Sequence, residues 1–237
     1  MPITPAMASM LRKQAAAASQ AAAQTGAASG SAYELMQAQL YQHTRTLKMI
    51  QSVERKVEAK RGFLADYWPW VDGVLSADKG GEDTVFTSVF VWAIDAHEYQ
   101  RALDMGAYIL KHGLKLPDRY QRDAATTLMD EFADASLKPG GIVNGPQLGD
   151  LCRVAELTAG FDVPDQARAK LYKAMGYAVA KRQDANDKFA ELTKTETTQA
   201  LALLTRAVEL HRECGAKKDI ERLDRRLKAL NDPAAAN

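Results

Sequence analysis

The chain has 237 residues, of which 46% are hydrophobic and 26% charged, and its formal net charge is +1. This length can bury a core in one large domain or two small ones, and the balance excludes a disordered or fibrous chain. The charge is unevenly distributed: residues 1–62 carry eight basic and three acidic side chains, which leaves the remainder with a net charge of −4. A basic N-terminal part on an acidic body is a pattern found in nucleic-acid-binding proteins.

Cysteine use and hydropathy exclude further classes of protein. The two cysteines, Cys152 and Cys214, belong to no CxxC motif or Cys/His cluster, so a disulfide framework is not expected. No stretch approaches the roughly 20 apolar residues of a membrane span. We therefore expect no membrane association and a reducing cytoplasm as the compartment.

Residues 1–31 are rich in alanine, serine and glutamine and contain no large apolar residue after Leu11. Such a segment cannot offset the entropy of ordering its backbone by burying apolar surface. We expect a disordered arm here, in which the high helix propensity of alanine supports transient helix only.

Residues 32–62 are predicted to form one long helix. Apolar residues recur at spacings of three and four, with His43 and Glu54 as polar exceptions, and no Pro or Gly interrupts the pattern before Gly62. A helix with so narrow an apolar stripe must pack against another helix, from its own chain or from a second copy. The candidate oligomer seam consists of Tyr33, Met36, Leu40, Leu47, Ile50 and Val57.

The basic side chains of this helix lie largely off the apolar stripe. They are available to the phosphate backbone of DNA, although a solvated helix face has the same composition. The candidate DNA-binding residues are Arg45, Lys48, Arg55, Lys56, Lys60 and Arg61.

Two of the three tryptophans stand in the segment Tyr67-Trp68-Pro69-Trp70. Proline is tolerated in the first turn of a helix and biases the preceding residue toward an extended backbone. One helix is therefore expected to end near residues 62–66, and another to begin at Pro69. The rings would pack the two helices together at a structural corner. Base stacking is the alternative, but two aspartates flank the rings and would repel phosphate.

The rest of the chain predicts further helices and no series of β-strands. The first half of this helical body covers residues 63–135 and includes a helix pair that Gly113 terminates. Residues 136–146 contain three glycines and two prolines and are predicted to form a loop. The second half covers residues 147–237 and has small and large residues spaced as in tetratricopeptide helix pairs. The predicted fold class is all-α, with a long N-terminal helix before tetratricopeptide-like pairs.

Motifs for cofactors and catalysis are absent from the sequence. It has no GxxxxGK[ST] or GxGxxG loop and no GxSxG or HExxH motif, so we expect no cofactor and no resident metal. Asp123, Asp130 and Asp134 share one face of a predicted helix and are weak candidates for a Mg²⁺-dependent nuclease site. Solvated helices often show the same spacing, which favours a structural interpretation.

The final helix carries a second candidate basic surface. Interleaved acidic residues allow i,i+4 ion pairs, which would explain its composition as well as an acidic partner would. The members of this surface are Lys217, Lys218, Arg222, Arg225 and Arg226.

Four segments of the sequence form an ordered set, and they read YWPWVDGVL, VFVWAIDAHEYQRALDMGAYILKHGLKLP, VPDQARAKLYKAMG and CGAKKDIERLDRRLKAL. Together they resemble the small terminase subunit family of tailed bacteriophages with cohesive-end DNA. The resemblance runs in this order from about Tyr33 to Leu230, and the aromatic-proline segment is among its most specific parts.

The resemblance implies a role in genome packaging in the host cytoplasm. Members of the family recognise the packaging site on double-stranded phage DNA, form homo-oligomeric rings, and recruit and regulate the large ATPase subunit of the terminase. The family is also labelled as an endonuclease subunit. Because the sequence shows no nuclease motif, we assign that label to the complex and carry over no catalytic residue. The alternatives are a metal-dependent endonuclease that cuts the cohesive-end site itself and a protein-binding helical repeat scaffold.

Overall fold

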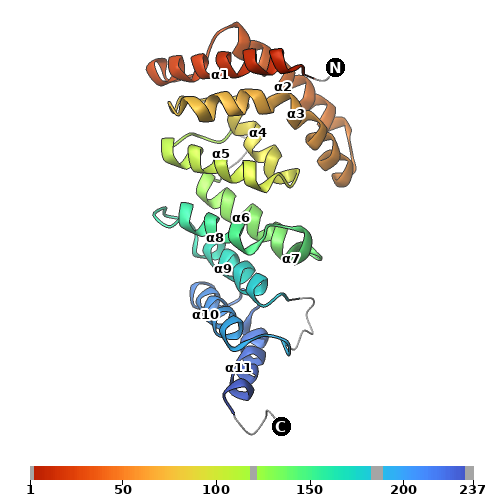
Figure 1. The fold of residues 1–237 in the computed structure, drawn as a ribbon, viewed down its shortest axis with the longest axis vertical. Coiled ribbons are helices and arrows are strands. Elements are labelled where there is room, and N and C mark those ends of the chain that lie inside the picture. The colour runs from red at the N-terminus through yellow and green to blue at the C-terminus, as the bar shows by residue number, and fades with distance from the viewer. Residues whose placement is uncertain (1–2, 118–121, 183–188, 233–237) are drawn as a thin grey trace. The chain divides into compact units, whose positions relative to one another are not determined.

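A computed structural model describes residues 3–117, 122–182 and 189–232 of the chain (Figure 1). These residues contain eleven helices and no β-strand, which confirms the all-α prediction. The chain divides into two units, residues 1–124 and residues 125–237. The tetratricopeptide-like character of the helix pairs stays a prediction.

The first unit is organised around α3, which packs against each of the other four helices of the unit. Its helices are α1 (Pro5–Thr25), α2 (Ser31–Met49), α3 (Val53–Ala77), α4 (Thr84–Asp95) and α5 (Tyr99–His112). The most buried is α4, in which every residue from Val85 to Ile94 is buried. Gly113 ends α5 with a φ of 65°, as predicted for a C-terminal glycine.

The second unit is built around the pair α9 and α10. Its helices are α6 (Ala124–Leu137), α7 (Gly141–Asn144), α8 (Leu148–Leu157), α9 (Asp165–Val179), α10 (Lys194–Leu210) and α11 (Lys217–Asn231). α8 packs on α9, and α11 packs on α10. The α9–α10 contact is close because Gly176 lacks a side chain: a Cβ there would lie 2.6 Å from Cδ2 of Leu204.

The N-terminal segment is a packed helix over residues 5–25, which corrects the expectation of a disordered arm. Thr4 caps the start of α1, and Gly26 ends it with a φ of 92°. One face of α1 buries Ala15, Ala18 and Ala22, and Figure 1 shows α1 alongside α3. Small side chains bury little area, but they allow two backbones to approach closely, so many weak contacts replace a few large ones.

The long helix expected over residues 32–62 is two helices, α2 and α3, joined through Ile50, Gln51 and Ser52. Ile50 adopts an extended backbone, and the Ser52 side chain accepts a hydrogen bond from the Arg55 amide at the start of α3. The heptad pattern runs across this break because it records which residues are buried, whereas the break is set by a local cap. Ser52, a residue type that favours the start of a helix, was the signal in the sequence for this break.

The expected corner at Pro69 is absent, because α3 continues without interruption from Val53 to Ala77. Pro69 lies inside the helix, where it cannot donate a backbone hydrogen bond, at a usual cost of about 3 kcal/mol. Tyr67, Trp70 and Val71 surround it in sequence and are fully buried. Their burial offsets the cost of the proline, so tertiary packing overrides the local preference.

The boundary between units falls at residues 124–125 and not in the glycine- and proline-rich segment 136–146. That segment contains the end of α6, a turn and the short helix α7. α6 belongs to the second unit, where Lys170 of α9 bonds Asp130 and Asp134 of α6. The glycines and prolines of this segment therefore mark a turn within the second unit, and not a boundary between units.

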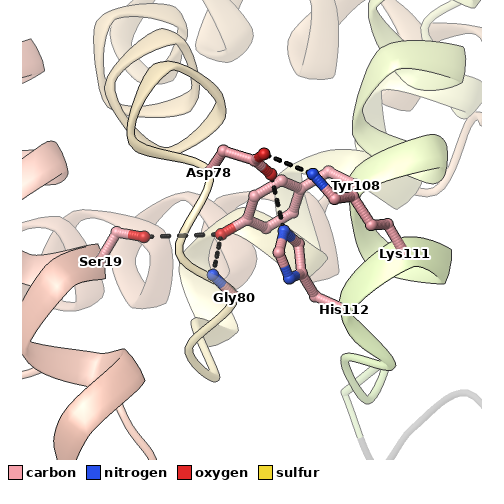
Figure 2. A network of polar contacts seen from close by, with 6 residues as sticks. All are labelled: Ser19, Asp78, Gly80, Tyr108, Lys111 and His112. Carbon is pink, nitrogen blue, oxygen red and sulfur yellow. Dashed lines mark hydrogen bonds and ion pairs between the residues drawn. The ribbon is translucent and has the colours of Figure 1, made fainter.

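A polar network fixes the connection between α3 and α4 (Figure 2). Asp78, the C-cap of α3, bonds the side chains of Lys111 and His112 on α5. The Tyr108 hydroxyl accepts a hydrogen bond of 2.9 Å from the Gly80 amide and lies 3.5 Å from the hydroxyl of Ser19 on α1. Gly80 is required, because a Cβ would lie 2.3 Å from Nδ1 of His112.

None of the described helices combines the length and apolar composition that a membrane crossing requires.

Candidate nucleic-acid interface

The predicted DNA-binding residues separate into two groups. Arg45, Lys48 and Arg55 are exposed, and Lys56 is half-buried. They lie near the end of α2 and in the first turn of α3, on either side of the short connection. We call these four residues, together with Met49 and Val53, the α2–α3 junction surface.

Lys60 and Arg61 form the second group and are occupied within the chain. Lys60 pairs with Asp95 at the end of α4, and the Arg61 guanidinium donates to the Ala96 carbonyl oxygen over 3.1 Å. Ala96 is the C-cap of α4, so both cations lie at the negative end of that helix. These contacts indicate a role in anchoring α4 to α3, although part of the Arg61 side chain is exposed. Among the six predicted DNA-binding residues, the junction surface holds those whose charges are not used in this anchoring.

Two exposed apolar side chains lie at the junction, a signal that the heptad analysis missed. Met49 ends α2 with 82% of its surface exposed, and Val53 begins α3 with 77% exposed. Arg45 lies 5.9 Å from the centre of the exposed Tyr41 ring, one turn earlier on α2. On such a surface, the cations can contact phosphates and the aliphatic side chains can contact base edges.

Four of the six predicted seam residues are buried within this chain. Tyr33, Met36, Leu40 and Leu47 face the interior of the first unit, where α2 packs against α3 and α4. Ile50 and Val57 are half-buried. The stripe thus finds its partner helices inside the chain, and the buried four contribute to the core of a single copy.

The aromatic segment forms part of the same core. Trp70 is fully buried, its indole Nε1 donates to Oδ2 of Asp83 over 2.8 Å, and its ring stacks on Tyr33 of α2. The Tyr33 hydroxyl accepts a hydrogen bond from the Thr84 amide. Trp70 therefore joins α2, α3 and the start of α4, which supports a structural role for the segment even though no corner exists.

Asp83 is a buried carboxylate with a defined set of donors. Oδ1 accepts from the Phe86 amide over 2.9 Å, which caps α4, and Oδ2 accepts from Trp70. Burial raises the pKa of this carboxyl, and the hydrogen bonds from Phe86 and Trp70 partly oppose that rise. Both hydrogen bonds thus favour the charged form of Asp83 against the effect of burial.

The other two aromatic residues differ in exposure. Tyr67 is fully buried, and its hydroxyl lies 2.9 Å from Nδ1 of His43. Trp68 is half-buried, and the Arg101 guanidinium lies 4.4 Å from its ring centre. Arg101 also pairs with Asp72 over 2.9 Å. A cation already occupies a face of Trp68, and a carboxylate lies beside it, which disfavours base stacking there.

His43 gives the first unit a predicted pH dependence. Its ring stacks on Phe63 at 3.9 Å, and burial lowers its pKa. A histidine whose pKa is lower in the folded state stabilises the fold above its unfolded pKa of about 6.5, and this stability is lost as the pH falls through that value. We expect the free energy of unfolding to fall on acidification from pH 7.5 to 5.5, and to fall less in His43→Gln.

Urea unfolding at several pH values measures this difference. The other three histidines are present in both proteins, so their contributions cancel in the comparison. Parallel pH profiles for the wild type and His43→Gln would contradict the assignment.

The three candidate catalytic aspartates do not form an open metal site. Asp130 is buried and accepts from Lys170 Nζ over 2.8 Å, and Asp134 accepts from the same ammonium over 3.1 Å. Asp123 is exposed and lies before the first residue of α6. Within the described part of the chain, no group of three or more acidic, histidine or cysteine residues is arranged to hold a metal ion.

The second basic surface is also partly occupied. Arg222 pairs with the buried Asp219 over 2.9 Å, and Arg226 donates to the Leu192 carbonyl oxygen. Lys217, Lys218 and Arg225 are exposed. α11 therefore uses two of its five predicted cations for packing and presents three to solvent.

Comparisons with known proteins agree with the resemblance of the four segments. The model of the family described as phage small terminase subunit matches residues 37–166. The chain is 36% identical over 201 residues to the "Terminase, endonuclease subunit" of Escherichia phage P2, and the alignment covers 85% of this chain and 76% of that protein. No solved structure matches the chain.

Proposed function

Because the chain belongs to the phage small terminase subunit family and so has a role in phage DNA packaging, we propose that it is the subunit that recognises DNA at the packaging site. The observation that supports this proposal is the α2–α3 junction surface. It combines four cations, three of them exposed, with two exposed aliphatic side chains.

The exposure and positive charge of the junction surface favour binding to double-stranded DNA. Arg45, Lys48 and Arg55 are exposed, and no ion pair holds them to a carboxylate among the described residues. They can neutralise phosphates and release condensed counterions, which supplies most of the sequence-independent affinity for DNA. The N-terminus of α3 adds the positive end of a 25-residue helix at the same place.

Removing the exposed cations of the junction is expected to weaken DNA binding. In the triple variant Arg45→Gln, Lys48→Gln, Arg55→Gln, we expect affinity for a duplex to fall at least about tenfold, and the slope of log K against log salt to flatten by about 2–3 units. Fluorescence anisotropy of the full chain with a labelled duplex, from 50 to 300 mM salt, measures both quantities.

The matched control removes the same number of charges from α11, as Lys217→Gln, Lys218→Gln, Arg225→Gln. These residues are also exposed, so the two variants lose equal net charge. If the α11 variant loses DNA binding and the junction variant retains it, the interface lies on α11. If both bind as the wild type does at every salt concentration, the DNA-recognition proposal fails, and the scaffold alternative is favoured.

We also propose that the chain self-associates and contacts the large terminase subunit in the host cytoplasm. Family membership supports association with phage DNA and with a large subunit. Since four of the proposed seam residues are buried in a single copy, the intermolecular contact must use other surfaces. Native mass spectrometry of the purified chain is expected to show one closed multimer, and a monomer at micromolar concentration would contradict self-association in the absence of DNA.

A second candidate function is DNA cleavage by this chain, because the relative from Escherichia phage P2 carries the words endonuclease subunit in its name. Incubation of the isolated protein with plasmid DNA and Mg²⁺ separates the two functions. Mg²⁺-dependent cleavage that Asp130→Ala abolishes, with folding retained, would favour the enzyme. Binding without cleavage would favour recognition alone.

A further inference from the structure

The second unit contains a cavity of about 380 Å³. α6 contributes Asp134, and α9 contributes Gln166, Lys170 and Lys173. Leu137 of α6, together with His211 and Cys214 between α10 and α11, completes the lining. This volume lies in the range of sites for small ligands or single side chains, about 300–1,000 Å³. All of the lining belongs to one unit, and none of it belongs to the α2–α3 junction surface.

The two lysines of the cavity differ in how their charges are compensated. Lys170 bonds both Asp130 and Asp134, and these bonds raise the pKa of its ammonium against the opposing effect of burial. Asp134 is 61% exposed at its side chain and is already paired. This wall of the cavity therefore needs no further counterion.

Lys173 has no such compensation. Its Nζ donates to the backbone carbonyl oxygen of Cys214 over 2.7 Å and lies 5.6 Å from the centre of the Tyr177 ring. Among the described residues, no carboxylate lies within ion-pair distance of this ammonium. Asp219, the acid that acts on it from farther away, accepts hydrogen bonds from Tyr177 and Arg222 and forms an ion pair with Arg182.

The surroundings of Lys173 disfavour its charge. Burial is the largest cause that lowers its pKa, and the neighbouring Arg182 lowers it further. A desolvated cation bonded only to a neutral oxygen gains most from an incoming anion, since charge-assisted hydrogen bonds are stronger than neutral ones. Gln166 and His211 provide neutral polar groups in the same lining.

We propose that this cavity binds a carboxylate, with Lys173 forming the ion pair. The ligand is a carboxylate on a short aliphatic chain, carried either by a free di-acid or by an acidic side chain of a polypeptide. The proposal goes beyond DNA recognition and stands independently of it, because neither the residues nor the ligand are shared.

Titration of the ¹⁵N-labelled full chain by two-dimensional NMR tests the proposal at constant ionic strength. The probes are glutarate, its neutral counterpart glutaramide, inorganic phosphate, and the blocked peptides Ac-Gly-Glu-Gly-amide and Ac-Gly-Gln-Gly-amide. We expect glutarate to shift the amide signals of Gln166, Lys173, His211 and Cys214, and glutaramide to leave them unchanged. The blocked glutamate peptide identifies the source of the carboxylate: it binds as well as glutarate if the site accepts a polypeptide side chain.

Three variants separate charge from folding. Lys173→Met keeps the aliphatic stem and is expected to weaken glutarate binding at least tenfold, whereas Lys173→Arg keeps the charge and is expected to stay within about threefold of the wild type. Lys194→Met removes an exposed lysine at the start of α10 and is expected to bind as the wild type does. Dispersion of the NMR spectrum reports whether each variant is folded.

Several outcomes overturn the proposal. Equal shifts from glutarate and glutaramide would show that the charge of the ligand is irrelevant. Unchanged glutarate binding in a folded Lys173→Met would show that Lys173 forms no ion pair with the ligand. Binding of phosphate but not glutarate would show that the cavity is a site for an anion other than a carboxylate. The comparison of glutarate with glutaramide uses the wild type alone, so it remains decisive if Lys173→Met does not fold.

Discussion

Replacing Trp70 with alanine is expected to lower the free energy of unfolding by about 4 kcal/mol, because truncating a buried aromatic side chain usually costs 3–5 kcal/mol. Trp70 is fully buried and stacks on Tyr33, so its removal leaves a cavity where α2, α3 and α4 meet. It also removes the donor to Oδ2 of Asp83. The donor that the buried carboxylate loses accounts for about 1–3 kcal/mol of this total.

Trp70→Phe separates these two contributions. Phenylalanine retains most of the apolar volume but has no donor for Asp83, so a smaller loss, of about 1–3 kcal/mol, is expected. Burial already raises the pKa of Asp83, and the indole opposes that rise. The pKa of Asp83 should therefore rise further in Trp70→Phe, and the destabilisation should diminish at acidic pH, where a protonated Asp83 needs no charge-stabilising donor.

Trp68→Ala is the matched control, since it removes the same kind of side chain two positions earlier in the same helix. Trp68 is half-buried, and its described contact is with the guanidinium of Arg101. We expect a loss of about 1 kcal/mol, the size of a cation–π contact at a partly exposed site. Urea unfolding followed by circular dichroism measures all three variants. Equal losses for Trp68→Ala and Trp70→Ala would contradict the structural account, and lost DNA binding at unchanged stability would favour base stacking.

Gly73→Ala is expected to destabilise the first unit by about 2–3 kcal/mol, the upper part of the range of about 1–3 kcal/mol for a substitution that overpacks a core. A Cβ at this position would lie 2.4 Å from the Arg12 carbonyl oxygen and 2.7 Å from Cβ of Ala15. The first of these atoms belongs to the backbone of α1, so no side-chain rotation relieves the overlap. α1 must move away from α3, which exposes the alanine face.

Gly62→Ala provides the opposite control in the same helix. A Cβ at Gly62 meets no atom within 4 Å, so alanine should stabilise α3 by about 0.5–1 kcal/mol through its higher helix propensity. Hydrogen exchange of the α1 amides, together with urea unfolding, measures both effects. Gly73→Ala should accelerate exchange in α1, and Gly62→Ala should not. If Gly73→Ala retains wild-type protection in α1, the close packing of α1 on α3 is wrong.

The local sequence determined the fold class and some helix ends, such as the end of α5 at Gly113. Helical periodicity, the absence of alternating strands and stop signals such as Gly113 are properties of neighbouring residues, so they can be read without knowing the partner surfaces. The same holds for the resemblance to small terminase subunits, which depends on ordered segments of the chain. The buried state of Tyr33, Met36, Leu40 and Leu47 also follows from the stripe, although its partner helices do not.

Only the tertiary structure decided which partners these elements take. The docking of α1 depends on Gly73, more than fifty residues from Ala15, and the continuity of α3 through Pro69 depends on the burial of Trp70 against Tyr33 and Asp83. The tertiary structure also decided which charged residues of the candidate sites are already paired within the chain. Lys60 and Arg61 anchor α4, and Lys170 holds Asp130 and Asp134. Lys173 is left facing a cavity with a neutral oxygen as its nearest acceptor. Charge and hydropathy are properties of a residue, whereas the availability of a charged group depends on neighbours that are distant in the chain.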